Sequence, residues 1–232
     1  MPPEGLPRPD EEWTEAVADS PDATLELLDR KKMFAGRVWT VVQDRVSIGS
    51  REAIRDVVVH PGAVAIIAID DQDNVLLIRQ YRHPVGMYLF EPPAGLLDVA
   101  GEPALQTAQR ELAEEAGVEA RTWHVLVDLF NSPGGSSEAI RVYLASDLSA
   151  LDGGRPHTGE AEEAHLPQVW VPLRQAVDLV LAGAIGSPSA VAGILALDTY
   201  RRGQSLLLRP ADAPWKARSW LESSHRIHGT QA

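Results

Sequence analysis

Short apolar runs bounded by polar turns dominate the first third of the chain. β-Branched residues fill positions 38–48 and 53–60 around a Gly49–Ser50 turn, a pattern that predicts a β-hairpin. Two further runs, 62–70 and 75–82, flank a polar turn and are almost continuously apolar. Such runs are typical of strands covered on both faces. The pattern therefore predicts an N-terminal β-subdomain followed by the first strands of a central sheet.

An amphipathic helix is the best-defined element of the sequence. The spacing predicts it over 102–116, because apolar side chains recur on one face at helical intervals: Leu105, Ala108, Leu112 and Ala116. Pro103 suits the first helical turn, and Gly117 suits the position after the last turn. A loop rich in Pro and Gly, 92–101, precedes the helix.

The remaining periodicity predicts a mixed sheet between helices, which is an α/β fold. Strands are expected at 123–129, 139–145 and 169–171, and helices at 173–182 and 189–202. The sequence has no internal repeat.

The chain divides into four segments. Residues 1–22 are rich in Pro, Asp and Glu and are predicted to form a disordered tail, and residues 23–60 hold the β-subdomain. Residues 61–203 are predicted to form one catalytic domain, since a chain of 232 residues is short for two independent enzyme domains. The extension 204–232 has two tryptophans in a polar background, and it either packs back on the domain or extends from it.

Charge and composition narrow the class of protein. A net charge of −12 without a Lys/Arg-rich block argues against a protein that grips long nucleic acid, whereas a small anionic ligand is compatible if metal held by carboxylates offsets the repulsion. The absence of cysteine excludes disulfides, thiolate zinc sites and a cysteine nucleophile. No signal segment is evident, and the longest apolar run, 63–69, is far below the roughly 20 residues of a membrane helix. We therefore expect a soluble, cytoplasmic protein with neither nucleic acid nor membrane as partner.

Three glutamates gather on one part of the predicted helix. At about 100° per residue, Glu114 lies about 60° behind Glu111, and Glu115 lies about 40° ahead of it. Like charges this close destabilise a helix unless cations lie among the oxygens, and Mg²⁺ prefers such ligands and bridges them to phosphates. The alternative is a solvated acidic face on which Arg110 and Glu114 form an ordinary ion pair.

The segment 95–118, GLLDVAGEPALQTAQRELAEEAGV, resembles the Nudix box. That box runs Gly, five residues, Glu, seven residues, then Arg-Glu-apolar-any-Glu-Glu-any-Gly-apolar. Every fixed position from Glu102 onward matches. Six residues rather than five separate Gly95 from Glu102, an insertion that a loop absorbs, and the role of Gly95 stays open.

The resemblance implies an α/β/α Nudix sandwich with a mixed sheet, and a Mg²⁺ site for which Mn²⁺ is an alternative ion. The implied metal ligands are three carboxylates and one backbone carbonyl: Glu111, Glu114, Glu115 and Ala94. Arg110 would orient one of the glutamates from outside the ligand set. Glu102, at the helix start, would be partly structural and favourable to the helix dipole.

Two flanking segments resemble the ADP-ribose pyrophosphatase group of this family. Pro133 lies sixteen residues beyond Gly117 in a Ser-Pro-Gly-Gly-Ser-Ser-Glu segment similar to the group's proline-bearing loop, with an ordinary turn as the alternative. Arg79 and Arg82 precede the box and would contact anionic phosphates or the terminal ribose, with plain surface arginines as the alternative. The resemblance runs from about residue 35 to about residue 192.

The same group exchanges its N-terminal β-subdomain across a homodimer, so residues there would complete the partner's site. Trp39 is the candidate for adenine stacking, and Arg55 is the candidate for a polar contact. A packed strand tryptophan is the alternative for Trp39. The resemblance thus implies a homodimer.

The general base is expected outside the box, in the acidic loop 159–165. Counted back from Trp170, Glu163 takes the position of the group's catalytic glutamate, and Glu162 is the neighbouring candidate; a solvated acidic loop is the alternative. The implied reaction is attack of an activated water on one phosphorus of ADP-ribose, which releases AMP and ribose 5-phosphate. Broader hydrolysis of nucleoside diphosphate sugars or dinucleotides is a second interpretation. A non-catalytic ligand-sensing module is a third, and such a module would be expected to have lost glutamates of the box.

Overall fold

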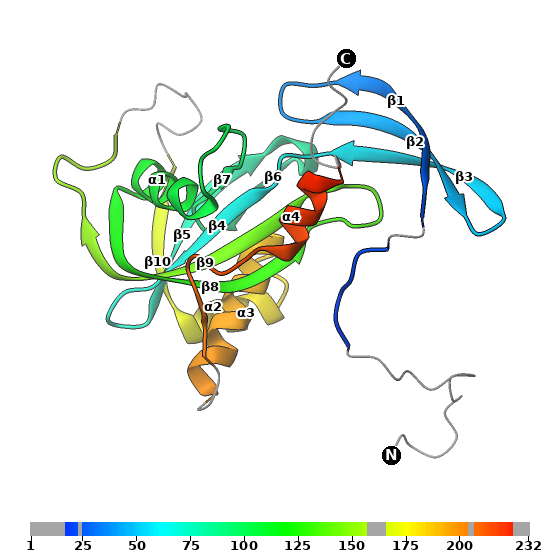
Figure 1. Cartoon of the computed structure of the whole chain (residues 1–232). Coiled ribbons are helices and arrows are strands. Elements are labelled where there is room, and N and C mark those ends of the chain that lie inside the picture. The colour runs from blue at the N-terminus through cyan, green and yellow to red at the C-terminus, as the bar shows by residue number, and fades with distance from the viewer. Residues whose placement is uncertain (1–16, 23–24, 157–165, 204–206, 225–232) are drawn as a thin grey trace.

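Three β-sheets and four α-helices make up the described part of the chain (Figure 1). The structure is a computed structural model that describes residues 17–22, 25–156, 166–203 and 207–224. None of the helices in these ranges is long and apolar enough to cross a membrane.

The N-terminal sheet is antiparallel, with strand order β1-β2-β3. It contains β1 (Leu27–Ala35), β2 (Thr40–Ile48) and β3 (Arg51–Val59), and Gly49 turns the predicted β2–β3 hairpin with φ 59°. The hairpin prediction is confirmed, whereas β1 was not predicted. Its residues are almost all exposed and many are polar, so it has no apolar alternation, and pairing with β2 makes it a strand.

The central sheet has five strands in the order β11-β8-β9-β4-β7. These are β4 (Ala63–Ala68), β7 (Ala94–Leu96), β8 (Val118–Phe130), β9 (Ala139–Ala150) and β11 (Arg209–Pro210). Strand β4 runs parallel to β9 while the other pairs are antiparallel, so the predicted mixed sheet is confirmed. Strands β8 and β9 extend beyond the predicted 123–129 and 139–145, because their polar ends continue to pair with each other.

A third sheet joins β10 (Gln168–Pro172), β5 (Asn74–Arg82) and β6 (Met87–Glu91) in the order β10-β5-β6. A short 3-10 helix, η1 (His83–Val85), connects β5 to β6. The first half of β5 is buried and its second half is exposed. The predicted core strand is therefore buried only over its first half, where it pairs with β10.

Helices cover both faces of the central sheet, which gives the predicted α/β/α sandwich (Figure 1). Helix α1 (Ala104–Ala116) packs with Val64 and Ile66 of β4. Helices α2 (Leu173–Leu181) and α3 (Pro188–Arg202) pack with Ala65 and Ile67 of the same strand. Since successive side chains of a strand point to opposite faces, β4 contributes to both cores.

Residues 213–221 of the C-terminal extension pack on the α1 face, so this part of it packs back on the domain. Trp215, just before α4 (Lys216–Ser223), is 8% exposed and belongs to the α1 core. Arg141 of β9 lies under its ring, 4.8 Å from the centroid, and donates to the carbonyl oxygen of Ala213 at 2.7 Å. Arg141 is itself paired with Asp128 of β8 at 2.8 Å. A buried arginine thus fixes residues 213–215 to two central strands.

Candidate active site

Helix α1 is held against the edge strand β7, and together they form the candidate site. The N–H of Ile66 donates to the carbonyl of Pro93 at 2.8 Å, so the next residue, Ala94, has its N–H and C=O pointing away from β4. The Ala94 N–H donates to Oε2 of Glu115 at 2.9 Å. The Ala94 carbonyl, which the resemblance implies is a metal ligand, therefore lies on the edge of β7 that Glu115 contacts.

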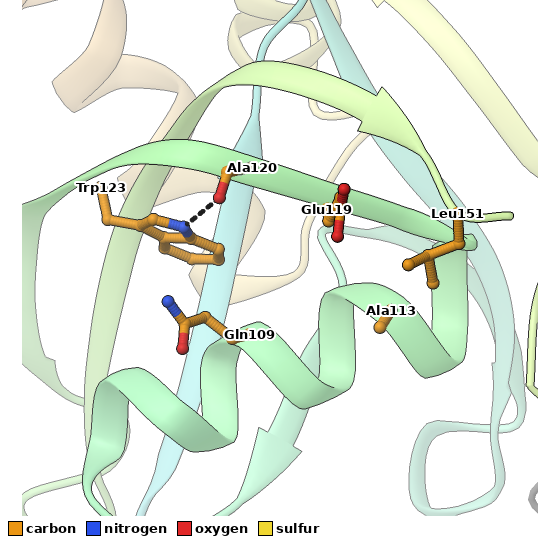
Figure 2. A pocket seen from close by; sticks show the side chains of 6 residues that line it. All are labelled: Gln109, Ala113, Glu119, Ala120, Trp123 and Leu151. Carbon is orange, nitrogen blue, oxygen red and sulfur yellow. Dashed lines mark hydrogen bonds between the residues drawn. The ribbon is translucent and has the colours of Figure 1, made fainter.

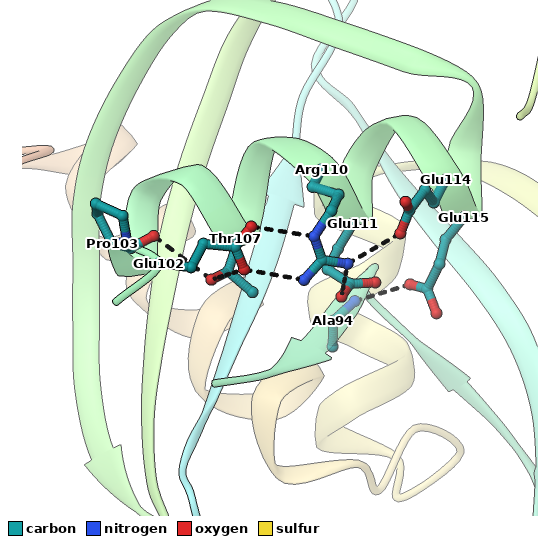
Figure 3. A network of polar contacts seen from close by, with 8 residues as sticks. All are labelled: Ala94, Glu102, Pro103, Thr107, Arg110, Glu111, Glu114 and Glu115. Atoms are coloured by element: carbon teal, nitrogen blue, oxygen red, sulfur yellow. Dashed lines mark hydrogen bonds and ion pairs between the residues drawn. The ribbon is translucent and has the colours of Figure 1, made fainter. Parts of the chain in front are cut away.

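Arg110 of α1 is the centre of a four-residue ion-pair network (Figure 3). Its Nε and Nη2 donate to the two carboxylate oxygens of Glu102 at 3.2 and 3.1 Å. Its Nη1 donates to Glu111 at 2.7 Å and to Glu114 at 3.0 Å. One guanidinium thus offsets the repulsion among Glu102, Glu111 and Glu114, while its role in orienting a metal ligand stays a prediction.

The ionisation of this network follows from the same contacts. Hydrogen bonding to Glu102, against the opposing effect of burial, raises the pKa of Arg110 above its ordinary value, and Glu111 and Glu114 raise it further. The hydrogen bond from Arg110 lowers the pKa of Glu102. A lowered carboxyl pKa means that the stabilisation is present at neutral pH and is lost only as the pH falls through that lowered value.

Glu102 acts before the helix rather than within its first turn. Helix α1 begins at Ala104, with Pro103 preceding it, and no acidic residue lies in the first turn. Glu102 accepts hydrogen bonds from Arg110 and, at 2.9 Å, from the hydroxyl of the buried Thr107. Its structural role is therefore to anchor Arg110 more than to interact with the helix dipole.

Gly95 leaves the space in which the Glu111 carboxylate lies. A Cβ at this position would stand 2.1 Å from Glu111 Oε1 and 2.3 Å from its Cγ. Glu111 is 8% exposed, so its side chain is enclosed by the fold. The extra residue after Gly95 does not remove this close approach, and the role that the sequence left open is steric.

The donor set suits a hard divalent cation, because carboxylate and carbonyl oxygens are the ligands such ions prefer. The Glu111 side chain lies against Gly95 of β7. In the described ranges, no three acidic or histidine side chains are arranged to hold an ion as they stand. Glu111 and Glu114 accept hydrogen bonds from Arg110, and Glu115 accepts one from the Ala94 amide. The residues fit the ion by chemistry, and the metal ligands stay predictions.

The predicted phosphate-binding arginines lie on β5 next to β6. Arg82 pairs with the buried Glu91 at 2.6 Å, three residues before Ala94. Arg79 is exposed and stacks on Tyr88, with its guanidinium carbon 4.1 Å from the ring centroid. Both are near the segment that leads into β7, and their contact with substrate stays a prediction.

The other predicted site residues are spread over different elements. Pro133 is exposed in the β8–β9 loop. Trp39 is 42% exposed before β2, and Arg55 is exposed on β3, so the N-terminal sheet presents both to its surroundings. Glu162 and Glu163 lie outside the described residues.

Two residues that the sequence did not single out cap the end of α1. Gln168 Nε2 donates to the carbonyl of Glu115 at 3.0 Å, and Arg155 Nε donates to the carbonyl of Glu114 at 3.2 Å. Gly117, with φ 67°, lets Arg155 approach, because a Cβ there would be 2.9 Å from its Cγ. Gly117 of the box is the sequence signal for this contact. Its partner Arg155 is 38 positions away, however, and no local pattern identifies that residue.

A cavity of about 250 Å³ lies on the opposite side of α1 from the carboxylates (Figure 2). Its lining includes Gln109 and Ala113, which lie about 160° around the helix from Glu111. Trp123 closes part of it and donates through Nε1 to the carbonyl of Ala120 at 2.9 Å. This cavity is separate from the candidate site.

We predict that Gly95→Ala displaces Glu111 and weakens divalent cation binding, while the fold is retained. The added methyl cannot coexist with the present Glu111 side chain. Calorimetric titration with Mn²⁺, with circular dichroism as the check on folding, measures the effect. Gly186→Ala is the matched control, because nothing lies within 4 Å of that Cβ. Unchanged affinity in a folded Gly95→Ala protein would contradict the steric role.

Comparison with known proteins identifies the family. Residues 59–194 match the family described as NUDIX domain. An ADP-ribose pyrophosphatase of Mycobacterium tuberculosis is 44% identical over 191 residues, which cover 82% of this chain and 90% of that protein. An ADP-ribose pyrophosphatase of Bacillus subtilis is 35% identical over 157 residues, which cover 67% and 82%. A crystal structure described as an ADP compounds hydrolase aligns with a TM-score of 0.68 and 25% identity, over 82% of this chain and 100% of that one. With its box on α1 and its sandwich fold, the chain belongs to the Nudix hydrolase family, as the segment 95–118 predicted.

Proposed function

We propose that this chain hydrolyses the diphosphate bond of ADP-ribose to AMP and ribose 5-phosphate, with Mg²⁺ as the cation. The observation that carries the proposal is the complete carboxylate cluster on α1, in a chain 44% identical to an ADP-ribose pyrophosphatase. In the reaction, a water oxygen forms a bond to one phosphorus and the bridging P–O bond breaks. Each product keeps one phosphate.

The cluster would hold the cation through Glu111, Glu114, Glu115 and the Ala94 carbonyl. When bound, a divalent cation lowers the pKa of water and neutralises the diphosphate. Arg110 keeps Glu111 and Glu114 together, and the Ala94 amide keeps Glu115 on the β7 side. These contacts place the carboxylates before substrate arrives, which lowers the entropy lost on binding.

Substrate contacts come from segments around the cluster. Arg79 and Arg82 supply positive charge in a protein of net charge −12, and the Pro133 loop supplies backbone groups. Glu163, with Glu162 as its neighbour, is our candidate for the base that accepts the proton of the attacking water. The remaining candidate contacts, Trp39 and Arg55, would reach the site of a second subunit.

A homodimer is the assembly that the exposed N-terminal sheet favours. Its outward apolar side chains include Met33, Phe34 and Ile54, which are 51%, 57% and 52% exposed. Single exposed apolar residues are ordinary, whereas several on one small sheet favour an interface. We also propose a cytoplasmic location, which cell fractionation tests.

Our prediction for the reaction is that ADP-ribose is hydrolysed faster than ADP-glucose or NADH, with AMP and ribose 5-phosphate as products. Chromatography identifies the products and measures the rate of hydrolysis of each compound. EDTA should abolish turnover and excess Mg²⁺ should restore it, because carboxylates alone cannot stabilise further negative charge at phosphorus. Equal rates on all three compounds would favour the broader activity, which the relative described as an ADP compounds hydrolase suggests. Full activity in metal-free protein would refute the metal dependence, and binding of ADP-ribose without turnover would indicate a sensing module.

Metal binding and water activation should fail separately in variants. Glu115→Gln removes ligand charge, so both Mg²⁺ affinity and turnover should fall. Glu163→Gln should leave Mg²⁺ affinity and KM largely intact while lowering kcat by roughly 10²- to 10⁴-fold, the usual range for a lost general base. Glu162→Gln is the control for loop charge. If it is the more damaging change, the base is Glu162; near-wild-type kcat in the double variant would remove this loop from the mechanism.

The dimer prediction concerns the protein in solution. Multi-angle light scattering at micromolar concentration should give twice the chain mass, because the N-terminal sheet would pair with a second copy. Phe34→Asp should shift the population toward monomer, while Leu207→Asp, at a position 96% exposed outside that sheet, should not. An active wild-type monomer would reject the exchange of Trp39 and Arg55 between subunits.

A further inference from the structure

The β8–β9 loop is hydrogen-bonded to the end of β3. The N–H of Val58 donates to the carbonyl of Gly135 at 2.8 Å, and the N–H of Ser137 donates to the carbonyl of Val58 at 3.0 Å. Val58 and Ser136 form a parallel bridge. The segment that follows Pro133 is thus a short extension of the N-terminal sheet, although it belongs to the loop between two strands of the central sheet.

Side chains strengthen this attachment. The N–H of His60 donates to Ser137 Oγ at 3.0 Å. His60 is 9% exposed, and its Nε2 lies 3.7 Å from Glu138 Oε1. The other oxygen of Glu138 accepts from Asn131 Nδ2 at 2.6 Å, so the carboxylate also ties the two ends of the loop together.

The imidazole is held in one orientation. The N–H of Gly62 donates to His60 Nδ1 at 3.0 Å, which assigns the proton of a neutral ring to Nε2, the atom facing Glu138. Burial lowers the pKa of His60, with Glu138 acting in the opposite direction. A neutral ring at physiological pH is consistent with this hydrogen-bond pattern.

The link between β3 and β4, residues 60–62, is fixed from other sides as well. The guanidinium of Arg218 on α4 donates to the carbonyl of Pro61. The N–H of Leu97 donates to the carbonyl of Gly62 at 3.1 Å. The N-terminal sheet, the β8–β9 loop and the central sheet therefore meet at one hydrogen-bonded junction, and none of them moves there without breaking these contacts.

The junction borders the carboxylate cluster. Ile140 pairs with Ala63, and Ala63 pairs with Leu96, so the start of β9 lies two strands from β7. At a strand spacing of about 4.8 Å, this separation is about 10 Å across the sheet. Leu96 follows Gly95, against which Glu111 lies. The loop is thus within reach of a nucleoside diphosphate bound at the cluster.

We propose that Ser137 and Glu138, together with His60, are positioning residues that hold the Pro133 loop in its substrate-binding geometry. The inference rests on the proposed function, because it takes ADP-ribose as the ligand of that loop. The contacts of these three residues run to one another and to Asn131, at the base of the loop, so we expect them to govern substrate affinity rather than the chemical step. They also couple that affinity to the placement of the N-terminal sheet.

The test compares Ser137→Ala, Ser137→Thr and Glu138→Gln in the full-length protein. Ser137→Ala removes the acceptor for His60 and should raise KM for ADP-ribose by about 3- to 10-fold, the range expected for one lost hydrogen bond, while kcat changes by less than about twofold. Ser137→Thr keeps the hydroxyl and should restore KM. Glu138→Gln should raise KM as well. Ser149→Ala is the matched control, since its hydroxyl bonds Glu119 at the far end of β9.

Hydrogen exchange gives a second measurement that needs no turnover. The amides of Val58 and His60 should exchange faster in Ser137→Ala than in wild type, with no change in the Ser149→Ala control. Unchanged exchange in Ser137→Ala would overturn the attachment itself. Faster exchange with unchanged KM, or a fall in kcat alone, would overturn the link to substrate. If the wild-type protein does not hydrolyse ADP-ribose, the proposed function fails, while the exchange experiment still decides whether the attachment exists.

Discussion

The mutual repulsion of the carboxylates on α1 is the constraint around which this site is built. Glu111 and Glu115 are 8% and 5% exposed, so water does little to screen them. Buried charges persist in proteins only when they are paired and hydrogen-bonded. Arg110 contacts Glu111 and Glu114, and the Ala94 amide contacts Glu115. The helix can therefore carry three clustered acids and still pack against the sheet, which an uncompensated acidic face could not do.

Two glycines of the box allow the charged residues around α1 to pack closely. The carboxylate of Glu111 needs the open position at Gly95. At the other end, Gly117 turns the chain and admits Arg155, which bonds a terminal carbonyl of the helix. The glycines of the box are thus steric partners of its charged residues, and the motif describes a packing arrangement as well as a set of ligands.

Segments that are distant in the sequence set the position of α1 and its carboxylates. Arg141 joins β8, β9 and the segment before α4 through Asp128, Ala213 and the ring of Trp215. Arg218 of α4 then reaches the link between β3 and β4. Residues 213–221 of the C-terminal extension consequently belong to the same core as α1, and Arg218 among them helps to fix the junction at which the N-terminal sheet and the β8–β9 loop meet.

The sequence by itself determined the features that local periodicity and fixed spacing encode. Helix α1, the β2–β3 hairpin, the doubly covered β4 and the box residues from Glu102 to Gly117 follow from such patterns. Tertiary structure alone decided that β1 and β7 are strands, because pairing rather than apolar alternation creates them. It also decided the clearance at Gly95, the Arg82–Glu91 pair, and the His60–Ser137 bond, whose partners are 77 positions apart. Contacts of this kind depend on how strands align in space, and no local pattern of side chains specifies that alignment.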